Sequence, residues 1–143
     1  MAKLERSITI NAPVEKVFDY LSDPNNLPEI WPSLVEVKDI QPLPSGGYKR
    51  RWVYKMSGIR LEGTAEDVEY IPNQCIFFKN TGGIEGTIAW SFQSEEGGTK
   101  LTVEAEYIVP IPVLGKVAEA FVVKINENEA VVFLANLKAK MET

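Results

Sequence analysis

Apolar and polar residues alternate along the middle of this chain, between residues 35 and 109. Alternation with a period of two is typical of strands that bury one face. Glycine-rich segments at 44–47, 82–83 and 95–98 interrupt it as hairpin turns do, and a change of phase near 66–67 predicts a β-bulge. The pattern therefore predicts an antiparallel sheet built from neighbouring strands. These strands cover residues 35–43, 48–57, 59–70, 74–81, 84–94 and 99–109.

The chain before this sheet predicts one more strand and a short helix. Residues 7–10 alternate as a strand does, and four apolar residues then recur at helical spacing: Val14, Val17, Phe18 and Leu21. We expect Asn11 to cap this helix and Pro13 to occupy its first turn. The helix should end before Pro24, because the residue that precedes a proline avoids the helical conformation. The proline-rich segment 24–32 has room only for a short helix or turn.

The last part of the chain predicts one long helix. Residues 113 to 141 contain no proline and a single glycine, which allows a helix of about 40 Å. Two apolar stripes occupy nearly opposite sides of it. The first comprises Leu114, Val117, Phe121 and Ile125, with Asn128 on the same face, and the second comprises Phe133, Leu134, Leu137 and Met141.

A straight helix cannot bury both stripes against one sheet. We therefore expect a kink or a tightened turn near residues 125–129, or a second contact surface for a homodimer or a protein partner. The alternative is that the end of the helix lies half exposed over a sheet edge.

Large apolar residues share one face of the predicted strands with several small residues, which suggests a hollow between sheet and helix. The candidate lining residues from the strands are Trp52, Tyr54, Met56, Leu61, Phe78, Ile88, Trp90, Phe92 and Tyr107. The long helix would add Leu114, Val117, Phe121, Ile125 and Asn128. Pockets for apolar ligands have this composition, with a few polar groups that fix orientation. An ordinary solid core needs the same residues, and the periodicity alone does not separate the two.

Composition narrows the chemistry. The chain has 143 residues, enough for one domain over residues 1–143, and a net charge of −5, which argues against nucleic acid as a partner. It contains no histidine, which removes serine–histidine and cysteine–histidine nucleophile pairs and the usual zinc ligand sets. We expect no cofactor and no metal. A single cysteine, Cys75, and the absence of a secretion signal or a membrane-length apolar run favour a cytoplasmic protein.

The pattern of charged residues within the strands predicts few catalytic groups, because most of these side chains should face solvent. The basic run 48–51 reads as the solvated start of an edge strand, although it could also attract an anionic group. Most carboxylates of the strands, such as Glu62 and Asp67, alternate with apolar positions and should face solvent. Tyr54, Tyr107 and Asn128 are then the candidates for acid–base groups inside a cavity.

The N-terminal motif resembles a known superfamily. Residues 10–23 read I-x-A-P-x-x-x-V-F-x-x-L-x-D after a strand, and Trp31-Pro32 follows. With the order of elements, this resembles the helix-grip superfamily of START, Bet v 1-like and polyketide cyclase/dehydrase-like proteins. The resemblance implies an α+β helix-grip fold, in which a curved antiparallel sheet of six to seven strands wraps around a long C-terminal helix. Two short helices would follow the first strand, and segment 110–115 would lie near the mouth of a cavity.

The same resemblance implies binding of an apolar small molecule, such as a lipid, an isoprenoid or quinone, or a polyketide. Such a protein would act as carrier, store or sensor, with at most transient membrane contact. An enzyme of the polyketide cyclase or dehydratase type is the alternative implied by other members of the superfamily. A protein-interaction module, which would use Phe133, Leu134 and Leu137, is the third.

Overall fold

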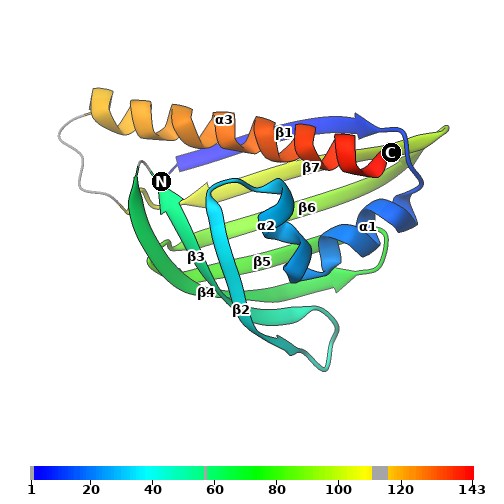
Figure 1. Ribbon diagram of the computed structural model, residues 1–143, viewed down its shortest axis with the longest axis horizontal. Coiled ribbons are helices and arrows are strands. Elements are labelled where there is room, and N and C mark those ends of the chain that lie inside the picture. The colour runs from blue at the N-terminus through cyan, green and yellow to red at the C-terminus, as the bar shows by residue number, and fades with distance from the viewer. Residues whose placement is uncertain (1, 57, 111–115) are drawn as a thin grey trace.

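A curved antiparallel sheet and one long helix dominate the computed structural model, which describes residues 2–56, 58–110 and 116–143 (Figure 1). The helices are α1 (Val14–Ser22), the 3-10 turn η1 (Pro24–Asn26), α2 (Leu27–Ile30) and α3 (Lys116–Met141). The strands are β1 (Ala2–Ile10), β2 (Leu34–Pro42), β3 (Tyr48–Met56), β4 (Ile59–Ile71), β5 (Cys75–Gly82), β6 (Gly86–Glu95) and β7 (Gly98–Tyr107). The predicted α+β helix-grip fold is confirmed.

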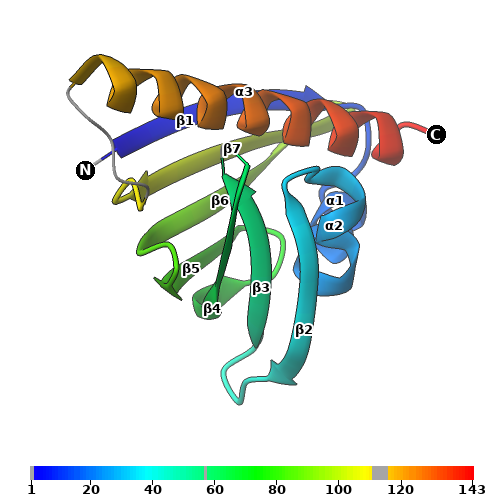
Figure 2. The same ribbon diagram turned by 60° about the vertical axis from the view of Figure 1, so that its left-hand side comes forward.

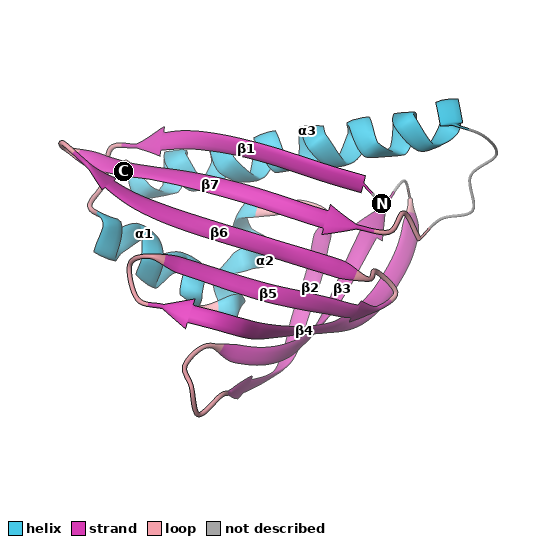
Figure 3. Ribbon diagram, turned by 180° about the vertical axis from the view of Figure 1, so that it is seen from behind, coloured by secondary structure: helices cyan, strands magenta, loops and turns pink. Residues whose placement is uncertain are grey.

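The seven strands form one sheet in the order β1-β7-β6-β5-β4-β3-β2. Six of the strands follow one another as hairpins, while β1 closes the order by pairing with the last strand, β7. Seen from behind, β1, β7, β6, β5 and β4 lie side by side (Figure 3). In the turned view, β3 and β2 lie at a steep angle to the other strands (Figure 2). The curved sheet therefore forms a trough beneath α3. The register of β4 against β5 shifts between Asp67 and Glu69, next to the predicted bulge.

Helix α1 begins differently from the prediction. Its N-cap is Pro13, without a side-chain capping bond, so the assignment of Asn11 as the cap was wrong. The main-chain N–H of Asn11 donates instead to Glu142 Oε2 at 2.8 Å. The Lys16 ammonium donates to the Met141 carbonyl at 2.8 Å. Together the two contacts hold the end of α3 against the β1–α1 junction.

Helix α3 runs without interruption over 26 residues, so the predicted kink near 125–129 is absent. Its C-terminal half supplies the packed face, with Phe133, Leu134, Leu137 and Met141 all buried. The expectation that the end of this helix forms an exposed contact surface was therefore wrong. The first stripe faces the other way, because Val117 is 86% exposed and Phe121 is 68% exposed. One straight helix thus buries one stripe and exposes the other.

The two ends of the trough are filled differently. At the α1 end, Phe18 packs edge-to-face against Phe92 and Tyr70, with ring centroids 5.2 and 5.3 Å apart. This end is a solid core. The cavity described below lies along the remaining part of the trough, between the sheet and the middle of α3.

Candidate ligand-binding cavity

A cavity of about 130 Å³ lies between the concave face of the sheet and α3. Its wall draws on every strand, on the α2 region through Leu27 and Trp31, and on the middle of α3. An engineered apolar cavity of about 150 Å³ in another protein holds benzene. The cavity is partly open to solvent, and its inner space has room for about one six-membered ring.

Seven of the candidate residues from the strands lie on the cavity wall. They are Trp52, Tyr54 and Met56 of β3, Phe78 of β5, Ile88 and Trp90 of β6, and Tyr107 of β7. Leu61 and Phe92 do not line it: Leu61 is only partly buried beside the core, and Phe92 is taken up by the contact with Phe18. Alternation identified the correct face for these seven residues, and the position along the strand decided which residues reach the cavity.

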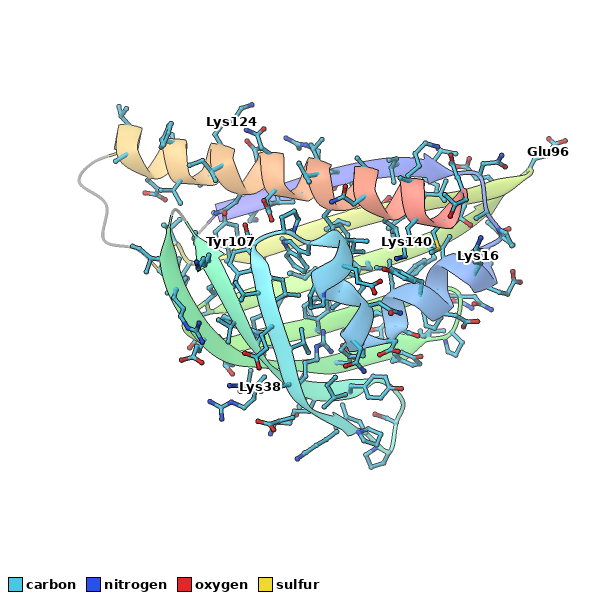
Figure 4. All side chains as sticks on the ribbon, viewed as in Figure 1. Lys16, Lys38, Glu96, Tyr107, Lys124 and Lys140 are labelled. Carbon is cyan, nitrogen blue, oxygen red and sulfur yellow. The ribbon has the colours of Figure 1, made fainter. Side chains whose placement is uncertain are left out.

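The helix contributes other residues than those the sequence suggested. Asn126, Glu129, Ala130 and Phe133 form the α3 part of the wall. Val117, Phe121 and Asn128 are exposed, Ile125 is half-buried and absent from the wall, and Leu114 lies outside the described residues. Lys124, on the exposed side, points away from the sheet (Figure 4).

The error on α3 has a simple geometric cause. The buried face is set by the C-terminal half, where Phe133 and Leu137 pack on the sheet. Stepping back from Phe133 at three to four residues per turn leads to Ala130 and Asn126. That step would have found the buried amide. The N-terminal stripe led instead to Asn128, which lies on the opposite side.

Aromatic rings form a continuous belt around the cavity. Phe78 meets Trp90 edge-to-face at 5.0 Å, and Trp90 stacks on Phe133 at 5.9 Å with an interplanar angle of 22°. Trp31 then contacts Phe133 at 5.2 Å and Tyr54 at 5.8 Å. Edge-to-face pairs add to the free energy of burial and hold each ring in one orientation. The belt therefore gives the cavity a defined shape.

One buried polar contact joins β3, β7 and α3. Asn126 Nδ2 donates to the Tyr107 hydroxyl at 2.7 Å and lies 3.7 Å from Met56 Sδ. Figure 4 places Tyr107 where the end of β3 approaches α3. Burial raises the pKa of Tyr107, with Asn126 acting in the opposite direction, so the phenol stays protonated at neutral pH. Since the hydroxyl accepts from Asn126, its own proton can be donated to another group.

Arg50 forms a second polar part of the wall and is held in a buried ion pair with Asp67. Arg50 is 4% exposed and donates from Nη1 to Asp67 Oδ1 at 2.8 Å, while Asp67 Oδ2 accepts the Tyr48 main-chain N–H at 2.8 Å. The guanidinium also lies 4.7 Å from the centre of the Phe78 ring. The basic run does not lie at a sheet edge, because β3 lies between β2 and β4. Lys49 and Arg51 are exposed as expected, and only Arg50 is buried. Asp67 likewise faces inward, contrary to prediction.

The Trp52 indole carries the one buried side-chain donor that has no hydrogen-bond partner within the described residues. Trp52 is 6% exposed and lines the cavity. Periodicity identified the residue, and only the three-dimensional contacts reveal that its N–H is unpaired.

The sequence matches a family model described as polyketide cyclase / dehydrase and lipid transport, over residues 1–142. The chain belongs to this family. It matches no curated protein at a significant level. A START superfamily protein from Mycobacterium smegmatis superposes with a TM-score of 0.83 at 16% identity, covering 99% of this chain and 98% of the other.

Two further solved structures share the fold of this polyketide cyclase / lipid transport family member. The Zhui aromatase/cyclase from a Streptomyces species gives a TM-score of 0.79 at 16% identity, covering 98% of this chain and 93% of the other. The Aha1 dimer from Colwellia psychrerythraea gives a TM-score of 0.70 at 16% identity, covering 99% of this chain and 97% of the other. The fold thus occurs in an enzyme and in a dimeric protein.

The carboxylates on the cavity wall of this family member already have partners. Glu129 Oε1 accepts the Ser33 main-chain N–H at 2.7 Å, and Glu106 pairs with Lys3 at 3.4 Å on the exposed side of the sheet. Burial, reinforced by the charge of Glu129, raises the pKa of Tyr54 far above its usual value. At neutral pH Tyr54 and Tyr107 are therefore neutral donors, beside apolar surface, the Arg50 guanidinium and the Glu129 side chain.

No helix within residues 2–56, 58–110 and 116–143 combines the length and the apolar character needed to cross a membrane. The same residues contain no group of three or more cysteine, aspartate or glutamate side chains placed to hold a metal ion.

Proposed function

We propose that this protein binds a hydrophobic small molecule in the cavity and acts as its carrier, store or sensor, without making or breaking a bond. The observation that supports this most is the partly open cavity of about 130 Å³ with its belt of aromatic rings. Burial of apolar ligand surface contributes roughly 25 cal/mol per Å² before the costs of association. A rigid aromatic wall reduces those costs, because few side chains need to be ordered on binding.

A cyclase or dehydratase is the second candidate, and the family description supports it. Such a reaction needs a group that accepts a proton inside the cavity. Tyr54 and Tyr107 are neutral donors at neutral pH, and Glu129 accepts a main-chain N–H. We therefore rank binding first.

Native mass spectrometry of protein purified from its own host tests the proposal, with extraction and identification of any bound compound. Ala130→Leu adds three carbon atoms to the cavity wall from α3 and is expected to lower the bound fraction. Ala135→Leu makes the same change on the exposed side of α3 and serves as the matched control. A ligand whose mass is unchanged after incubation supports carriage, whereas a new product mass supports the enzyme.

A clean mass without ligand, together with no binding from a library of apolar compounds, would contradict the proposal. Equal ligand occupancy in Ala130→Leu and Ala135→Leu would place the binding site outside this cavity.

A further inference from the structure

The face of α3 that points away from the sheet is mostly apolar. Its exposed residues form one stripe along the helix, which we call the outer stripe: Val117, Phe121, Lys124, Asn128, Val131, Val132, Ala135 and Ala139. A surface helix normally turns a polar face to water, and a helix that is apolar on all sides is normally covered on all sides. Lys124 and Asn128 are the polar members of the stripe. The outer stripe therefore has the composition of a contact surface.

The two ends of the outer stripe complement each other in size. Val117 and Phe121 make its N-terminal end bulky, whereas Ala135 and Ala139 make its C-terminal end small. Two copies of α3 that pack antiparallel set the bulky end of each against the small end of the other. In one register, Val117 lies opposite Ala135 of the second copy. Phe121 then lies opposite Val131 of the second copy.

The same register pairs opposite charges. It brings Lys124 beside Glu127 of the second copy, and a two-fold axis forms this contact twice. Within the described residues Lys124 takes part in no ion pair, and its side chain points away from the sheet (Figure 4). Glu127 lies at the margin of the outer stripe and accepts from Arg6 Nη2 through Oε2 at 3.1 Å. Its Oε1 can accept from a second cation.

We infer that the outer stripe is the contact surface of an antiparallel homodimer, in which α3 packs against α3 of a second copy. Between Val117 and Ala135 the stripe is about 27 Å long and about 10 Å wide, so it buries about 300 Å² on each copy. A stable interface buries about 800 Å² per partner. The dimer is therefore weak, with a dissociation constant on the order of 100 µM. At the low micromolar concentrations of unfolding experiments the protein is monomeric.

Sedimentation equilibrium from about 10 µM to about 1 mM protein tests the dimer. We expect the weight-average mass to rise from that of the monomer toward that of the dimer. Phe121→Glu places a charge in the contact and should weaken association at least about tenfold. Val68→Glu makes the same kind of change at an exposed apolar residue of β4, remote from α3, and should leave association within about twofold of wild type.

Charge reversal tests the register. Lys124→Glu and Glu127→Lys should each weaken association about fivefold, because each sets like charges side by side across the contact. The double variant restores opposite charges and should return to within about twofold of wild type. Arg6→Gln removes the same intramolecular ion pair as Glu127→Lys and should leave association unchanged.

Disulfide cross-linking gives an independent readout of the antiparallel arrangement. In a Cys75→Ser background, Val117→Cys mixed with Ala135→Cys should form a mixed disulfide under mild oxidation, because facing residues of packed helices come within reach. Neither variant should cross-link with itself, since identical positions lie about 27 Å apart along the helix axis.

A monomeric mass at every concentration would overturn the inference, and so would a dimer that Phe121→Glu leaves intact. Efficient cross-linking of Val117→Cys with itself would overturn the antiparallel arrangement. Binding of the monomer to phosphatidylcholine vesicles, lost in Phe121→Glu, would assign the outer stripe to a membrane surface instead. The cavity lies on the opposite side of α3, so these outcomes leave the proposed binding function untouched.

Discussion

At the scale of single residues, one position on α3 decides whether an amide is structural. Asn126 and Asn128 are two residues apart, yet Asn126 is buried against Tyr107 whereas Asn128 is exposed. Composition and local sequence treat the two residues alike. Only the direction of the helix face distinguishes them.

Asn126→Ala is expected to lower the free energy of unfolding by about 1–3 kcal/mol, because it removes a buried hydrogen bond and leaves the Tyr107 hydroxyl without its donor. Asn128→Ala should change it by no more than about 0.5 kcal/mol. Urea denaturation of both variants measures the difference. Equal effects would show that the Asn126 contact contributes nothing to stability.

The buried pair of Arg50 and Asp67 gives a second test at this scale. Asp67→Ala leaves the arginine charge buried without a counter-charge and removes the acceptor of the Tyr48 N–H. We expect a loss of about 3–5 kcal/mol in the free energy of unfolding. Glu62→Ala breaks an exposed pair with Arg60 and should cost no more than about 1 kcal/mol.

The double variant Arg50→Met, Asp67→Leu should be more stable than Asp67→Ala alone, because it removes both buried charges. Chemical denaturation of the four proteins completes the comparison. A double variant as unstable as the single one would show that the Tyr48 contact, rather than the charge, dominates.

At the scale of elements, the strands were predictable and the orientation of α3 was not. Strand alternation depends on neighbours two residues apart, so Trp52, Tyr54 and Met56 could be placed on one face directly. The side that a long helix buries depends on which half packs on the sheet. Leu137 is fully buried while Val117 is open to solvent, and both belong to equally apolar stripes.

Two phenylalanines of α3 test this orientation. Phe133→Ala removes a ring that stacks on Trp90 and contacts Trp31, and we expect a loss of about 3–5 kcal/mol in unfolding free energy. Phe121→Ala, on the exposed side, should stay within about 0.5 kcal/mol of wild type. Thermal and urea unfolding measure both. A large loss for Phe121→Ala would mean that its side of the helix is covered in solution.

At the scale of the whole molecule, burial keeps several phenols protonated. The pKa values of Tyr54 and Tyr107 are raised chiefly by burial, and that of Tyr20 by burial and its bond to Glu29. These residues come from three separate parts of the chain. The sequence marked two of them as inward-facing, but the extent of their burial follows from the assembled trough.

Stability should therefore fall in alkaline solution. An unfolded tyrosine titrates near pH 10; because the folded pKa is higher, the folded state holds its proton longer, and unfolding becomes easier as pH rises past about 10. Below that pH the contribution is fully present. Urea midpoints measured between pH 8 and 11, beside tyrosinate absorbance, check this. In Tyr54→Phe the urea midpoint should decline less steeply with pH. An unchanged slope would contradict the contribution of Tyr54.

All three tryptophans of the chain, Trp31, Trp52 and Trp90, lie on the cavity wall. Indole emission depends on the polarity of its immediate surroundings, so the tryptophan fluorescence of this protein originates entirely from the cavity wall. Any molecule that enters the aromatic belt displaces solvent or quenches these rings directly. The unlabelled protein is therefore its own optical sensor of occupancy, suited to screening compounds without a reporter dye.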